Sequence, residues 1–190
     1  MTVVLDSRAV GDPARFLPFD ELRARLETRP PAPRDVGRVV GLVTRVDGGR
    51  REILTRARVT VTGGMPGDAW GRKPDPKPEA QLAVMQVDVA ELIANGQPLA
   101  LFGDNLFLDL DLSAANLPPG TRLRAGGVTL EVTPKPHNGC GKFGARFGED
   151  ARRLVIDPGL RPRNLRGIYL RTVMDGELAV GQTIEVVRRG

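Results

Sequence analysis

Several short segments of the chain alternate apolar and polar residues, which is the pattern of a strand with one buried face. From residue 56 on, Ala57, Val59 and Val61 alternate with polar residues that include Arg56 and Arg58. A period of two residues places the arginines on one face and the apolar side chains on the other. The pattern predicts a half-buried strand with a basic outer face.

Turn-forming residues separate these segments along the chain. Twenty-three glycines and sixteen prolines, with few long stretches of helical periodicity, favour short strands joined by turns over a helical bundle. The predicted strands cover 38–46, 52–62, 81–86, 106–112, 121–125, 128–133, 168–174 and 177–187. We expect a mainly β fold, a closed or partly closed barrel of roughly seven or eight strands with a few short helices.

Helical periodicity is confined to three short segments, 18–27, 89–95 and 143–156. Asp88 and Glu91 have the spacing of a capping box at the start of the second segment. The first segment is followed by the proline-rich stretch 29–33, which reads as a linker. We therefore expect an N-terminal helical extension with a proline-rich linker over 1–35 and a β-barrel domain over 36–190.

The charge pattern limits the classes of binding partner that we expect. The net charge of +5 comes mostly from arginines, but these are spread along the chain among acidic residues, and aromatic residues for base stacking are scarce. Nucleic acid is therefore not the expected partner. No run of about 18 apolar residues is present, and residues 1–6 do not resemble a signal peptide. We expect a cytoplasmic protein that does not associate with membranes.

The chain's single cysteine and single histidine, Cys140 and His137, lie three residues apart in one loop. Glycines flank Cys140, and Lys142 and Arg146 follow it closely. Nearby cations lower the pKa of a thiol, and the thiolate is the form that attacks electrophiles or binds metals. Composition alone leaves a reactive thiol and a structural one both open. His137 is either a functional group that titrates near neutrality or an ordinary loop histidine.

A series of short motifs resembles the MOSC domain, the family named for the C-terminal domain of molybdenum cofactor sulfurases. The resemblance covers about 38–188, and its specificity comes from the order of the motifs rather than from any one of them. The motifs are Gly67-Asp68, Gly103-Asp104-Asn105-Leu106, Pro119-Gly-Thr-Arg-Leu-Arg124, Glu131-Val-Thr133, Gly139-Cys140, Lys142-Phe143 and Arg166-Gly167.

The resemblance implies a MOSC-type β-barrel that binds the molybdenum cofactor, a pterin dithiolene bearing a phosphate. In this family a shared cysteine binds molybdenum or is proposed to carry sulfur, and Cys140 is the only residue that matches it. The resemblance thus assigns Cys140 as catalytic residue and metal ligand. The candidate cofactor-binding residues are Arg56, Arg58, Gly67, Asp68, Asp104, Asn105, His137, Lys142, Arg146 and Arg166.

Three functions follow as alternatives. The first is reduction of a small N-hydroxylated or N-oxygenated substrate. Because one cysteine cannot hold an iron–sulfur cluster, a separate electron-donor protein would supply the electrons. The second is a sulfur or cofactor carrier that holds a persulfide on Cys140 and receives it from a sulfur-donor protein. The third is a non-catalytic basic binding module. The chain lacks the length for the family's additional modules, so we expect a stand-alone domain.

Overall fold

The computed structural model describes residues 4–6 and 10–190, so the predicted extension 1–35 lies partly outside the described residues, at 1–3 and 7–9. The strands are β1 (Val4–Asp6), β2 (Val36–Arg45), β3 (Arg50–Leu54), β4 (Arg56–Val59), β5 (Leu82–Gln86), β6 (Leu106–Asp109), β7 (Arg122–Ala125), β8 (Val128–Val132), β9 (Ile168–Met174), β10 (Gly176–Ala179) and β11 (Thr183–Arg188). The helices are α1 (Phe19–Glu27), α2 (Val87–Ala94), α3 (Gly141–Phe147) and α4 (Glu149–Val155).

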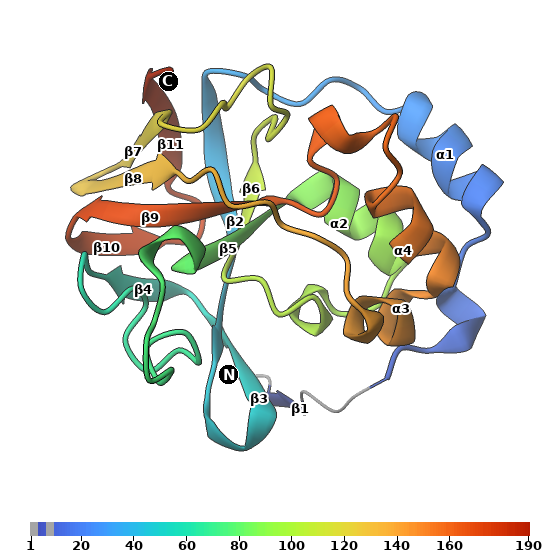
Figure 1. The fold of residues 1–190 in the computed structure, drawn as a ribbon, viewed down its shortest axis with the longest axis horizontal. Helices are drawn as coiled ribbons and strands as arrows, with labels where there is room; N and C mark the ends of the chain where they lie inside the picture. The colour runs from blue at the N-terminus through green and yellow to red at the C-terminus, as the bar shows by residue number, and fades with distance from the viewer. Residues whose placement is uncertain (1–3, 7–9) are drawn as a thin grey trace.

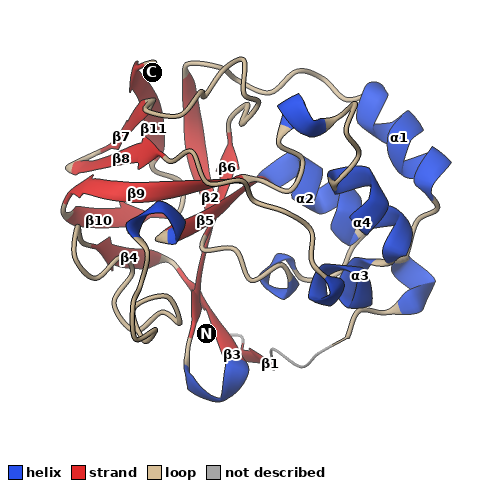
Figure 2. Ribbon diagram, in the orientation of Figure 1, coloured by secondary structure: helices blue, strands red, loops and turns tan. Residues whose placement is uncertain are grey.

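Seven strands form a closed barrel in the order β2-β11-β7-β8-β9-β5-β6, and β6 pairs back onto β2. All neighbours in this ring are antiparallel except β5 and β6, which are parallel and joined through α2. Parallel neighbours need such a crossover, because a tight turn between two neighbouring strands makes them antiparallel. The mainly β barrel predicted from the alternating pattern is confirmed (Figures 1 and 2).

The helices α1, α2, α3 and α4 cover one side of the barrel, where they are labelled in Figure 2. Strands on that side are buried on both faces: in β6, Leu106 and Leu108 point into the barrel core, whereas Phe107 packs with the helices. Met85 of β5 likewise joins the helical layer, where Phe102 and Phe147 stack at 3.9 Å between ring centroids. The fold thus has two apolar cores, one inside the barrel and one between the barrel and the helices, and β5 and β6 separate them.

Two predicted strands are each divided in the structure. The segment 52–62 breaks at Thr55 into β3 and β4, and β4 pairs with β10 in a separate two-stranded sheet. The predicted alternation holds for buried Ala57 and Val59, but it is wrong for Val61, which is 48% exposed. The segment 177–187 divides in the same way into β10 and β11.

The helix predicted over 143–156 is two helices, α3 and α4. Gly148 separates them with φ +90° and ψ 154°, a backbone conformation that is essentially restricted to glycine. The capping box predicted at Asp88 and Glu91 is also wrong. The helix α2 begins at Val87, and the Asp88 carboxylate accepts a hydrogen bond from the backbone N–H of Val89 instead. Among the described residues, no helix has the length and apolar character to span a membrane.

Candidate functional site

A cavity of about 370 Å³ lies where the β2–β3 hairpin, the turn before β6 and helix α3 meet. The chain reaches α3 directly from β8, along the orange segment that crosses from the barrel to the helices in Figure 1. This segment carries His137 and Cys140. Five of the predicted site residues line the cavity: Asp104, His137, Lys142, Arg146 and Arg166.

Asp104 and Arg166 form a buried ion pair in the wall of this cavity. Nη1 of Arg166 lies 3.0 and 2.8 Å from the two carboxylate oxygens of Asp104. The Asp104 side chain is fully buried, and that of Arg166 is 10% exposed. Gly103 and Gly167 precede and follow these residues with φ +76° and +96°, so the two glycine-containing turns bring the pair together. A charge-assisted pair in this setting fixes both side chains in one geometry.

Asp68 and Asn105 lie behind the cavity in a second polar network. Arg45 donates from Nε and Nη2 to the two oxygens of Asp68, at 3.0 and 2.5 Å. The amide of Asn105 donates to Asp68 at 3.0 Å, and its oxygen accepts from Arg45. Burial raises the pKa of Asp68, but the hydrogen bonds and charge of Arg45 outweigh burial and hold that pKa below its usual value. Gly67, before Asp68, has φ +84°, as a turn requires.

His137 is buried in the cavity wall, with its side chain 7% exposed. Its ring packs against Tyr169 at 4.4 Å between centroids, and Nδ1 lies 3.6 Å from a carboxylate oxygen of Asp104. Burial lowers the pKa of His137 to about 3, although Asp104 opposes the shift and Arg166 and Arg45 support it. The imidazole is therefore neutral at physiological pH.

Arg51 and Arg146 add two buried cations to the same cavity. Nη1 of Arg51 donates to the carbonyl of Leu101 at 3.1 Å, and its Nε has no hydrogen-bond partner among the described residues. Burial, with the charges of Arg146 and Arg45, lowers the pKa of Arg51 to about 10. The Nε atom of Arg166 is likewise buried without a partner within the described chain.

Cys140 is exposed and precedes the first turn of α3. Burial raises the pKa of the thiol, but the backbone N–H groups of Phe143 and Lys142 and the charge of Arg166 outweigh it, so the pKa lies below its usual value. Burial lowers the pKa of Arg146, which the Cys140 charge opposes. Cys140 is not among the cavity-lining residues, but its charge interacts with those of Arg166 and Arg146 in the cavity wall.

We expect the Cys140 thiol to be alkylated by iodoacetamide at lower pH than an ordinary thiol. Because only the thiolate attacks, a lowered pKa moves the midpoint of the rate-against-pH curve below about 8.5, the value of an unperturbed cysteine. The rate would be measured by mass spectrometry from pH 5 to 10, with a cysteine-containing peptide as the control. A midpoint equal to that of the peptide, or above it, contradicts the lowered pKa.

Arg56 and Arg58 are not part of this cavity. Both are exposed residues of β4, and Arg56 pairs with Glu177 of β10 at 2.9 Å. Three lining residues that the sequence analysis missed are Arg45, Arg51 and Tyr169. Arg51 directly follows Arg50 in the β2–β3 hairpin, and only the fold distinguishes the buried arginine from the exposed one. Within the described residues, no group of three or more His, Cys, Asp and Glu side chains is placed to hold a metal ion.

The comparisons with known proteins agree on the fold. A family model described as the MOSC domain matches residues 58–185. The YUAD protein from Bacillus subtilis superposes with a TM-score of 0.57 at 16% identity, covering 80% of this chain and 95% of that one. YiiM from Escherichia coli superposes with a TM-score of 0.52 at 19% identity, covering 80% of this chain and 71% of that one. No curated protein sequence matches the chain.

Proposed function

The chain belongs to the MOSC domain family, and on that premise we propose that it binds the molybdenum cofactor, with the Cys140 thiolate as a metal ligand. The proposal rests on one observation: a thiol of lowered pKa lies beside a cavity in which buried Arg51 and Arg166 each have an Nε with no hydrogen-bond partner among the described residues. An unpaired buried donor is costly, and a ligand that accepts from it repays the cost.

The residues present fit a ligand that carries both sulfur-bound metal and phosphate. A thiolate is a soft ligand and suits a metal that is already held by sulfur. Guanidinium groups match phosphate oxygens through paired hydrogen bonds. Gly103 keeps the cavity open at Arg51, because an added Cβ would lie 3.2 Å from the guanidinium. We infer that Arg51, Lys142, Arg146 and Arg166 hold the phosphate and pterin.

When bound, the cofactor supplies two-electron redox chemistry. We infer that the reaction is reduction of an N-hydroxylated or N-oxygenated compound. Reduction of an N–OH group to N–H takes up two electrons and two protons and releases water. The electrons would come from a separate protein, because one cysteine cannot hold an iron–sulfur cluster. In this scheme the neutral imidazole of His137 positions the substrate through a hydrogen bond, and the Asp104–Arg166 pair keeps the wall around it fixed.

A sulfur or cofactor carrier is the second candidate, and the exposure of Cys140 favours it. A persulfide carrier must present its sulfur to a donor protein, and an exposed thiol at the rim of a cavity meets this need. The third candidate, a basic nucleic-acid module, needs arginines at the surface. Exposed arginines are present, but Arg56 among them pairs with Glu177, whereas the buried Arg51, Arg146 and Arg166 surround a cavity that suits a small ligand better than a nucleic-acid chain.

We expect protein purified from cells that synthesise the cofactor to contain molybdenum in a stoichiometric ratio, measured by mass spectrometry together with pterin fluorescence. Arg51→Gln is expected to lower the molybdenum content about tenfold, because a charged hydrogen-bond donor is lost. The control is Arg58→Gln, which changes an exposed arginine outside the cavity and should leave the content unchanged. Cyanide-labile sulfur without molybdenum would contradict the proposal and favour the carrier.

A further inference from the structure

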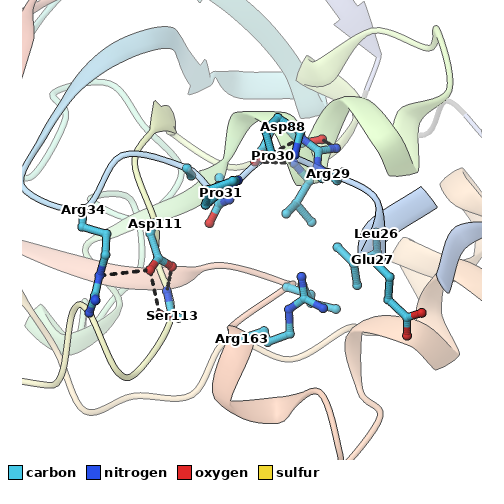
Figure 3. Close-up of a pocket in the computed structure, with 14 residues that line it drawn as sticks. Leu26, Glu27, Arg29, Pro30, Pro31, Arg34, Asp88, Asp111, Ser113 and Arg163 are labelled. Atoms are coloured by element: carbon cyan, nitrogen blue, oxygen red, sulfur yellow. Dashed lines mark hydrogen bonds and ion pairs between the residues drawn. The ribbon is translucent and has the colours of Figure 1, made fainter. Parts of the chain in front are cut away.

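A second, larger cavity lies beneath the proline-rich segment that follows α1. Its volume is about 520 Å³, within the usual range of small-molecule sites, and it shares no lining residue with the cavity beside Cys140. Residues 29–34, which we call the strap, form one wall. The start of α2, the loop after β6 and the turn Arg161–Arg163 form the others (Figure 3).

The strap is anchored at both ends and makes no hydrogen bond in its middle among the described contacts. At one end, Arg29 pairs with Asp88 at 2.6 Å. At the other, the carbonyl of Pro33 accepts from the backbone N–H of Asp111 at 2.7 Å, and the carbonyl of Arg34 accepts from Asn116 at 2.9 Å. Pro30 and Pro31, which line the cavity between the anchors, have no N–H. They give it a rigid, apolar wall.

Six charged residues line this cavity, and five of them have a partner. Glu27 pairs with Arg23, Arg29 with Asp88, and Arg34 with Asp111. In the part of the chain that the structure describes, the Arg163 guanidinium makes no ion pair or hydrogen bond. In Figure 3 its side chain points into the space between the strap and the loop that carries Asp111. The lining therefore presents one unpaired positive charge. The six residues are Glu27, Arg29, Arg34, Asp88, Asp111 and Arg163.

Arg29 offers a second unused donor at the same cavity. Its Nε is buried and has no hydrogen-bond partner among the described residues. Burial lowers the pKa of Arg29, Glu91 opposes this, and the positive charge of Arg163 lowers the pKa further. The two guanidinium groups are thus close enough to repel each other. An anion between them would remove this repulsion and satisfy the Nε donor.

We propose that this cavity binds a small organic monocarboxylate whose carboxylate group pairs with Arg163 and accepts from Nε of Arg29. The paired N–H groups of a guanidinium match the two oxygens of a carboxylate. One charge without a partner suits a monoanion, because each of the other five charged lining groups already has an oppositely charged partner, which for Glu27 is Arg23 outside the cavity. The apolar body of the ligand packs against Pro30, Pro31 and Leu165. The proposal is independent of the molybdenum cofactor.

The test is calorimetric titration of the full chain with 3-phenylpropionate and with its neutral analogue 3-phenylpropionamide. We expect saturable binding of the carboxylate, at least about tenfold tighter than that of the amide, because the charge-assisted hydrogen bonds are absent in the amide. Arg163→Ala is expected to abolish this preference, and Arg163→Lys is expected to restore part of it. Since Arg163 has no side-chain partner among the described residues, both variants should melt at the wild-type temperature.

Arg161→Ala is the matched control, because Arg161 belongs to the same turn but does not line this cavity. It should leave the affinity for 3-phenylpropionate unchanged. Three results would each overturn the proposal: no saturable binding, equal affinity for acid and amide, or equal losses in the Arg163→Ala and Arg161→Ala proteins.

Discussion

Replacing Asp104 with alanine is expected to lower the free energy of unfolding by about 3–5 kcal/mol, the usual cost of removing one partner from a buried ion pair. The carboxylate is fully buried and holds Nη1 of Arg166 at 3.0 and 2.8 Å. Its negative charge also acts on Arg45, Arg51 and Arg146. Without it, these cations face one another in a poorly solvated wall. Urea unfolding at pH 7 measures the change.

Two further variants show whether the lost ion pair causes this effect. In the Asp104→Ala protein, adding Arg166→Met should recover part of the stability, because the uncompensated charge is removed. Glu177→Ala is the control, since Glu177 pairs with Arg56 at the surface and its loss should cost less than about 1 kcal/mol. A loss below 1 kcal/mol for Asp104→Ala, or a double variant less stable than the single one, contradicts this account of the pair.

The second large effect is expected from Cys140→Ser. A serine hydroxyl is not deprotonated near neutral pH and is a harder ligand than a thiolate, so it suits molybdenum poorly. Even the loss of an outer partner of a metal ligand typically costs 10–100-fold in affinity. We therefore expect the molybdenum content of the Cys140→Ser protein to fall by at least about tenfold. Stability should be unchanged, because Cys140 is exposed.

The alternating pattern predicts the strands well, because each barrel strand has one face toward the apolar interior. It cannot predict the closure of the barrel, which depends on pairing between β2 and β6, about 70 residues apart. The break at Thr55 is also hidden in the sequence, because no glycine or proline marks it between residues 52 and 62. The tertiary fold alone directs β4 toward β10.

The sequence predicts only part of the candidate site, because some of its residues stand out in the sequence and others do not. Cys140 stands out because it is the only thiol, and Asp104 and Arg166 stand out within motifs. Arg51 and Arg45 carry no such signal in a chain with many arginines, because only the fold distinguishes them: Arg51 is buried, and Arg45 pairs with the buried Asp68. The sequence does not decide whether His137 is an ordinary loop residue or a functional one, and in the fold its side chain is buried against Tyr169.

The matched family region begins at residue 58, but the barrel needs β2, which precedes it. Without β2, the other six strands would leave the barrel open between β11 and β6. Both of these strands pair with β2. The hairpin from β2 to β3 also supplies Arg45 and Arg51 to the cavity. Residues 36–54 are thus structurally part of the barrel and of the site, although the family model does not reach them.

Molybdenum-edge X-ray absorption tests the central claim most directly, recorded on the wild-type protein and on the molybdenum that the Cys140→Ser protein retains when it is supplied with excess cofactor. If the Cys140 thiolate binds the metal, the number of sulfur neighbours of molybdenum falls by one in the serine variant. Identical sulfur shells in the two proteins would contradict a role for Cys140 as a ligand.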